Sequence, residues 1–177
     1  MKISAKDIQK LREATSAGVM DCKQALTKAK GDFDKARGVL RQKGIALAAK
    51  KSSRQAREGR IEAYIHLNNK IGVLIELNCE TDFVAKCEDF QNLGKDIAMQ
   101  IAALNPLYLS REDVPKDVVK ENKAHLENFY KENCLLEQAF VKDQAKTVKD
   151  CLTEVIAKIG ENILIRRFIR FQLGEVS

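Results

Sequence analysis

The spacing of apolar residues changes near residue 60, from a helical period to the period of a strand. Before that point, apolar side chains recur every three or four positions, which predicts amphipathic helices. One helix is expected after Ser4, a second over residues 20–29, and a third from Phe33. These three helices are expected to form a small bundle, followed by a basic linker over residues 46–59.

After Gly59, apolar and polar residues alternate, which indicates strands with one apolar face each. Residues 61–67 and a run ending at Cys79 alternate in this way, and the Asn-Asn-Lys sequence between them is typical of a hairpin turn. Residues 163–173 are expected to add a third strand beside the hairpin. Its two faces are predicted to hold Ile163, Ile165, Ile169 and Phe171 on one side, and Arg166, Phe168 and Arg170 on the other.

Three later segments return to helical spacing. A long helix is predicted over residues 84–104, where the Asn-Pro pair that follows ends it. Another is predicted across residues 118–129, after a cap formed by Ser110 and Asp113, and a last one over residues 144–159.

Together these elements predict an α+β fold in two domains. Residues 1–52 are expected to form the three-helix domain with its basic linker. Residues 53–177 are expected to form a three-stranded antiparallel sheet backed by helices.

The predicted corner between the second strand and the long helix holds the most informative residues of the chain. Its sequence is Asn-Cys-Glu-Thr-Asp-Phe-Val-Ala, residues 78–85. Thr81 or Asp82 can cap the first free amides of the helix, but a cap does not explain an aromatic residue at an exposed corner. An apolar plug beside a charge suits contact with another protein. Thr81, Asp82, Phe83 and Val84 are therefore candidate partner-binding residues.

Composition excludes several classes of protein. With 177 residues, 45% of them apolar, the chain can bury a core, and it has neither an apolar run long enough to span a membrane nor a signal-peptide core. The five cysteines form no Cys-x-x-Cys pair, and the two histidines lie far apart in sequence, so no metal site is expected and the thiols should be reduced. No phosphate loop, nucleophile elbow or zinc helix is present. These features predict a cytosolic protein that is not an enzyme and needs no cofactor or metal.

A basic run lies between Arg41 and Arg60, with seven basic residues and only Glu58 as an acid. Its surplus of six equals the net charge of the whole chain, +6. Such a run can bind nucleic acid phosphates, but no aromatic residue for base stacking is interleaved with it. A solvated linker, or a surface that meets an acidic partner, is the favoured interpretation.

Residues 78–85 resemble the characteristic motif of the elongation factor Ts family, the bacterial guanine nucleotide exchange factors for elongation factor Tu. The likeness extends over most of the chain and keeps the family's order. The other matching blocks are residues 11–23 (Leu-Arg-Glu-Ala-Thr-Ser-Ala-Gly-Val-Met-Asp-Cys-Lys), 40–44, 135–143, 159–163 and 166–168.

The resemblance implies a fold and a mechanism. The N-terminal bundle should resemble ubiquitin-associated domains, and the factor should bind elongation factor Tu and promote GDP release, without binding nucleic acid or membrane. Phe83 is implied to enter an apolar pocket of the GTPase while Asp82 disturbs its magnesium site. A second contact surface is implied at Arg12, Val19, Met20, Asp21 and Lys23, although Met20 is also compatible with a place in the core.

Two departures from the family pattern matter. Ser16 stands where a glycine is usual between the first two helices, which predicts strain if the turn needs positive φ. The chain has room for one half of the duplicated core of long family members, so the resemblance implies a short form that pairs as a homodimer.

Several assignments stay open at this point. His66 either touches the partner or is a solvated residue on a strand, and Phe140 either faces the partner or packs within its own loop. One of Arg166 and Arg167 is expected to point outward and the other to meet an acid. Two other functions remain: a basic nucleic-acid module, and a ubiquitin-binding adaptor that leaves residues 60–177 unexplained.

Overall fold

The computed structural model describes residues 3–15 and 17–175, which form two units. The first unit contains the described residues up to Arg54 together with Thr153–Asn162. The second contains Gln55–Leu152 and the described residues from Ile163 onward. The expectation about Ser16 lies outside the described residues.

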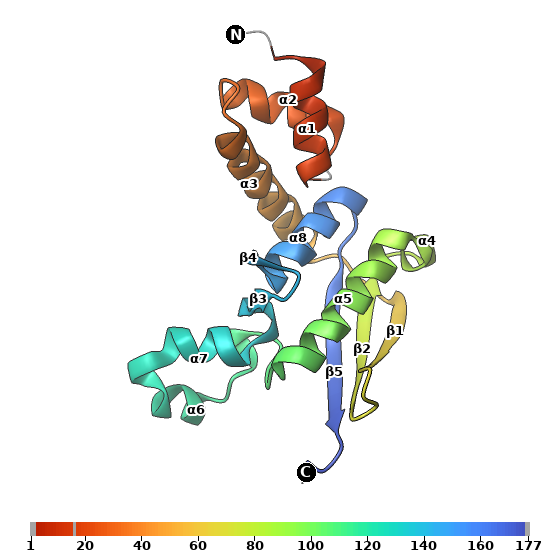
Figure 1. Ribbon diagram of the computed structural model, residues 1–177, viewed down its shortest axis with the longest axis vertical. Helices are drawn as coiled ribbons and strands as arrows, with labels where there is room; N and C mark the ends of the chain where they lie inside the picture. The colour runs from red at the N-terminus through yellow and green to blue at the C-terminus, as the bar shows by residue number, and fades with distance from the viewer. Residues whose placement is uncertain (1–2, 16, 176–177) are drawn as a thin grey trace. The chain divides into compact units, whose positions relative to one another are not determined.

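Three helices build most of the first unit: α1 (Ala5–Thr15), α2 (Val19–Lys28) and α3 (Phe33–Lys51) (Figure 1). The expected cap at Ser4 is present, because its Oγ accepts a hydrogen bond of 3.2 Å from the amide of Asp7. The core of the bundle consists of Leu11, Cys22, Ala25, Leu26, Ala29 and Ala36.

Helix α3 is longer than expected, since it continues to Lys51 through half of the predicted linker. Residues 45–51 are mainly Ala, Leu and Lys, which are strong helix formers. At Gly44, a Cβ would lie 3.6 Å from side-chain atoms of Ala157 and Thr153, so the helix packs closely against the last helix of this unit. Packing along this face therefore supports the additional helical turns.

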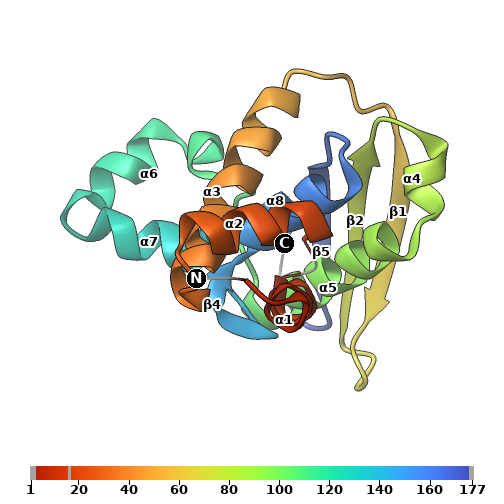
Figure 2. The ribbon, with the colours of Figure 1, turned by 90° about the horizontal axis from the view of Figure 1, so that it is seen from above.

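The second unit is organised around a three-stranded antiparallel sheet: β1 (Glu58–Ile65), β2 (Ile71–Cys79) and β5 (Leu164–Gln172). The strand order is β1-β2-β5, which confirms the predicted hairpin and third strand. Helix α5 (Glu88–Leu104) packs on β1 and β2 (Figure 1, Figure 2). The buried side chains here are Val73, Ile75, Leu77 and Cys79 from the sheet, and Phe90, Leu93, Ile97 and Ile101 from the helix.

The predicted face of β5 is wrong because the strand contains a β-bulge. Glu76 pairs with Arg167 but the next residue, Leu77, pairs with Ile165, so Arg166 is an extra residue on β5. Each added residue reverses which side chains face the core. Ile163 and Ile165 are buried, whereas Ile169 and Phe171, which were expected on their face, lie on the opposite side and are 47% and 63% exposed.

The long helix predicted after the corner is broken into α4 (Asp82–Lys86) and α5, with Cys87 in an extended conformation between them. Ala85 and Phe90 are both buried, yet five residues along one straight helix point about 140° apart. The break lets both side chains reach the core. The side-chain amide of Gln91 donates a 2.9 Å hydrogen bond to the carbonyl of Lys86.

The helix predicted across residues 118–129 is also interrupted. It consists of α6 (Lys116–Glu121), a 3-10 turn η2 (Lys123–His125) and α7 (Leu126–Asn133), and this arm extends away from the sheet (Figure 1). The side chain of Asn122 donates to the carbonyl of Val118 at 2.9 Å, which competes with helix continuation. The expected Ser110–Asp113 capping box is present, but it caps the 3-10 turn η1 (Arg111–Asp113).

The helix predicted over residues 144–159 begins later, as α8 (Val148–Ile159). The preceding residues form a second hairpin from β3 (Ala139–Phe140) and β4 (Asp143–Thr147), which the sequence did not predict. Thr147 then caps α8, because its Oγ1 accepts a 3.1 Å hydrogen bond from the amide of Asp150.

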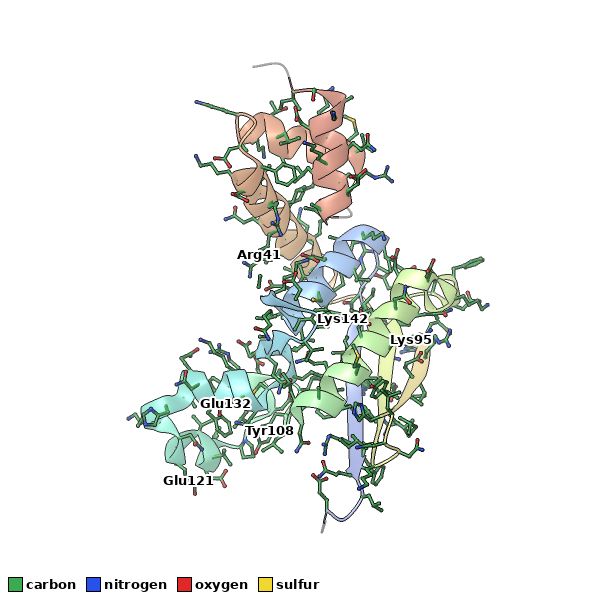
Figure 3. The ribbon with its side chains drawn as sticks, viewed as in Figure 1. Arg41, Lys95, Tyr108, Glu121, Glu132 and Lys142 are labelled. Carbon is green, nitrogen blue, oxygen red and sulfur yellow. The ribbon has the colours of Figure 1, made fainter. Side chains whose placement is uncertain are left out.

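Buried amides attach this second hairpin to α5. Gln100 donates to Gln138 Oε1 and to the carbonyl of Ala139, both at 3.1 Å, and accepts from the amide of Val141 at 2.8 Å. Lys142 adds an ion pair of 2.6 Å with Asp96 (Figure 3). Phe140 is buried within this arrangement, so its role is packing.

Candidate functional site

The candidate site lies where β2 ends and α4 begins. Thr81 is the cap of α4, because its Oγ1 accepts a hydrogen bond of 3.4 Å from the amide of Val84. The buried thiol of Cys79 donates to the carbonyl of Thr81 at 3.1 Å. The structure thus resolves the two capping alternatives in favour of Thr81 and leaves Asp82 in the first turn of the helix.

A glycine in β1 allows the strands to come together beside this corner. Gly59 pairs with Asn78 and has a φ of +145°, a conformation that side chains disfavour. A Cβ at this position would collide with the carbonyl oxygen of Leu77 and lie 2.7 Å from the Cα of Asn78. The strands can therefore pair beside the corner only if residue 59 is a glycine.

The side chains of α4 divide between core and solvent. Ala85 is buried and Val84 is half-buried, whereas Phe83 is 82% exposed. A short helix fixed by a cap at one end and a buried alanine holds the ring of Phe83 outward. An exposed aromatic ring on a rigid element is an anchor that another surface can bury.

Asp82 places a negative charge beside that ring. Its carboxylate accepts a hydrogen bond of 2.7 Å from Lys86 one helical turn later, and this bond lowers the pKa of Asp82. Asp82 is therefore ionised at neutral pH. Both side chains are exposed, so a binding partner can reach the carboxylate and compete with Lys86 for it.

The second set of candidate residues lies in the first unit, at the start of α2. Val19 and Met20 are 50% and 62% exposed, so Met20 is not part of the bundle core. Asp21 forms an ion pair of 2.6 Å with Lys43 of α3, and Lys23 is exposed. Arg12 lines a shallow surface hollow with residues of α1 and Lys158. The set thus combines two exposed apolar side chains with charged neighbours.

The sheet of the second unit has an open apolar face that the sequence did not predict. The pairing of β1 with β2 places apolar residues of both strands on the side opposite α5, and the bulge in β5 adds Ile169 and Phe171 to that side. Their exposed fractions range from 46% to 63%, and the residues are Ile61, Ile65, Leu74, Ile169 and Phe171. Strict alternation along β5 would have placed Ile169 and Phe171, two of these five, toward the helix, so only the strand pairing could locate this surface.

The structure also gives the surroundings of His66, of the two arginines of β5 and of the cysteines. His66 is half-buried and its Nδ1 lies 3.1 Å from the hydroxyl of Tyr64. Arg167 forms an ion pair of 2.8 Å with Glu76, while Arg166 is exposed, as expected of the two arginines. All five cysteines are free.

The described residues offer neither a metal site nor a membrane-spanning helix. Within residues 3–15 and 17–175, no group of His, Cys, Asp and Glu side chains is suited to hold a metal ion. Among the helices formed by these residues, none has both the length and the apolar character needed to cross a membrane.

The fold and the corner define an α+β protein that presents an exposed aromatic residue beside an acid on a capped helix. The sequence matches the family described as Elongation factor TS over residues 4–128 and 123–175. The chain therefore belongs to the elongation factor Ts family.

Individual relatives match the chain over nearly its whole length. Elongation factor Ts of Caldanaerobacter subterraneus subsp. tengcongensis is 54% identical, with 98% of this chain and 98% of that protein covered. Elongation factor Ts of Fervidobacterium nodosum is 51% identical, covering 99% and 100%. The same factor of Anaeromyxobacter sp. (strain K) is 55% identical, covering 98% and 90%.

The comparisons also show a difference in length. The alignment with the Caldanaerobacter protein has 195 positions, although this chain has 177 residues, so about 20 positions have no residue here. The two family matches overlap at residues 123–128, which comprise η2 and the first residues of α7.

Proposed function

We propose that this chain is a guanine nucleotide exchange factor for elongation factor Tu in translation elongation. It would bind the GDP-bound GTPase, promote GDP release and leave the empty site free for GTP. Membership of the elongation factor Ts family supports this proposal. The observation that carries it is Phe83, an 82% exposed ring beside the ionised Asp82 on a rigid corner.

The exchange mechanism follows from coupled binding. A factor that binds the empty GTPase more tightly than the GDP form lowers the affinity for GDP by the same ratio. Phe83 would enter an apolar pocket of the GTPase domain, and Asp82 would disturb the surroundings of the magnesium ion. Loss of that ion leaves the diphosphate charge unneutralised, and GDP then dissociates faster. Thr81 and Val84 hold this pair in place by starting the helix.

The first unit would supply a second contact with the GTPase. Val19 and Met20 provide exposed apolar area there, and Arg12, Asp21 and Lys23 provide the surrounding charges. This contact would add affinity and orientation, so its loss should weaken binding while Phe83 still acts. The complex would form in the cytoplasm, without a cofactor, metal, membrane or nucleic acid ligand for this chain.

We further propose that the chain acts as a homodimer through the open apolar face of its sheet. An apolar surface built from three strands is larger than the isolated apolar residues usual on monomers. Two identical sheets can pack face to face about a two-fold axis and bury it. Sedimentation across a range of protein concentrations tests this, and a fully active monomer at high dilution would contradict it.

The exchange activity is tested by the release rate of a fluorescent GDP analogue from elongation factor Tu. Adding the wild-type protein should accelerate release, and the Met20→Ala variant should need a higher concentration for the same effect. An Asp82→Asn variant should lower the maximal acceleration, because it removes the charge and keeps the shape. If the wild type does not accelerate release at any concentration, the proposal is wrong.

A further inference from the structure

One segment of the chain has basic residues and no acidic ones. Residues 35–57, called here the acid-free segment, contain eight Lys and Arg residues and no Asp or Glu. The rest of the chain contains 23 basic and 25 acidic residues, so it has a small net negative charge. The positive charge of the protein is therefore concentrated in 23 consecutive residues.

Most of the acid-free segment lies on α3, where Figure 3 shows the side chain of Arg41. Asp34, in the first turn, is the only acidic residue of α3, and none stands between Lys35 and Lys51. Like charges four residues apart on a helix, such as Arg37 and Arg41, repel each other. The charges of α3 are therefore not arranged to stabilise the helix by themselves.

Some bases in the segment have structural partners. Lys35 pairs with Asp32, Lys43 pairs with Asp21, and Lys51 donates to the carbonyl of Gly160. Arg41 and Arg54 also interact with other groups. Exposed bases such as Arg37 and Lys50 still contribute a positive field that extends about 10 Å into solution at 0.1 M salt.

We propose that the acid-free segment steers this protein toward an acidic surface of its GTPase partner. The proposal rests on the proposed exchange function. A concentrated field of one sign speeds the encounter of two proteins by about 10- to 1,000-fold and acts before any contact forms. A protein partner is favoured over single-stranded nucleic acid because the segment contains no aromatic residue on which a base could stack, and the test includes an RNA duplex as the alternative.

The test compares two variants that remove the same charge at different places. The steering variant combines three exposed positions of the acid-free segment: Arg37→Gln, Lys50→Gln and Arg57→Gln. The control variant combines three exposed positions of the arm: Lys116→Gln, Lys120→Gln and Lys123→Gln. Association and dissociation rates with elongation factor Tu are measured by stopped flow at salt concentrations from about 0.05 to about 0.5 M. Over this range, the distance across which charges act in solution falls by about threefold.

At low salt, the steering variant should associate about fivefold more slowly than the wild type, a modest share of the range for steered encounters. The difference should vanish at high salt, and dissociation and the maximal GDP release rate should stay unchanged. The control variant should associate at the wild-type rate. Equal losses in both variants, or a faster dissociation of the steering variant, would overturn the proposal.

Two further outcomes separate this proposal from its basis. If the wild type accelerates GDP release but its association rate does not depend on salt, steering is wrong and the exchange function stands. If the wild type does not accelerate release, both proposals fail. If the steering variant keeps its association rate but loses binding to an RNA duplex probe, the segment is a nucleic-acid surface instead.

Discussion

Replacing Phe83 with alanine should weaken the action of this protein on elongation factor Tu while leaving the fold intact. The ring is 82% exposed in the free protein, so its removal takes away few internal contacts. We expect the free energy of unfolding to change by no more than about 0.5 kcal/mol, as for other surface substitutions. The effect of the substitution should therefore appear in binding to elongation factor Tu.

The size of that effect follows from the apolar area that a partner can bury. Complete burial of a Phe side chain contributes about 1.5–3 kcal/mol. Because nearly the whole ring is available, we expect a loss of about 2 kcal/mol, which is about a 30-fold higher concentration for half-maximal acceleration. The assay is the release of a fluorescent GDP analogue over a range of factor concentrations, with urea unfolding measured on the same preparation.

Two matched substitutions make the result decisive. Phe90→Ala removes the same ring from a residue that is 1% exposed, so it should cost about 3–5 kcal/mol of stability. Leu107→Ala removes an apolar side chain that is 60% exposed outside the site, so both exchange and stability should match the wild type. A folded Phe83→Ala variant with wild-type concentration dependence would refute the proposed anchor, and an unfolded one would show that Phe83 belongs to the core.

Three other predictions follow from the structure. Gly59→Ala should lower the free energy of unfolding, measured in urea, by at least about 2 kcal/mol, because this residue has a positive φ and no space for a Cβ. Gly38→Ala, at a position on α3 with open space around it, should raise the same free energy by about 0.5–1 kcal/mol. Equal effects of the two substitutions would contradict this reasoning. Phe171→Glu should shift the sedimentation of the protein from dimer to monomer, because dimer formation would bury an unpaired charge between the two sheets. An unchanged dimer would place the interface elsewhere. Burial raises the pKa of Cys134 to about 11, so at pH 8 a thiol reagent should modify the half-buried Cys87 and Cys151 before Cys134, which should react only on unfolding; early modification of Cys134 in the folded protein would contradict this.

Much of the fold could be predicted because the relevant signals are local. The hairpin, the third strand and the N-terminal helices follow from hydrophobic period, turn residues and caps that lie within a few residues of each other. The candidate corner could be found in the same way, since Thr81 and Asp82 stand between an alternating run and a helical one. The family motifs add a partner and a role for Phe83, which the period of the chain does not contain.

The errors share one cause, which is that tertiary contacts override local preference. The extended conformation of Cys87 brings both Ala85 and Phe90 into the core, although residues 84–104 look like one helix. Strand pairing turns residues 143–147 into β4, although they have helix-forming side chains. For Cys87 the deciding contacts are those of α4 and α5 with the strands β1 and β2, whereas β4 pairs with the nearby β3 and the resulting hairpin is held by Gln100 of α5.

The sequence by itself determined which residues form helices and strands in most of the chain, the acid-free segment, and the composition of the corner. Only the tertiary structure decided that Phe83 is exposed while Phe90 is buried, and that one extra residue at Arg166 turns Ile169 and Phe171 to the open face. The physical reason is that period and charge are properties of neighbouring residues. Exposure and strand register depend on hydrogen bonds and packing between segments that only folding brings together.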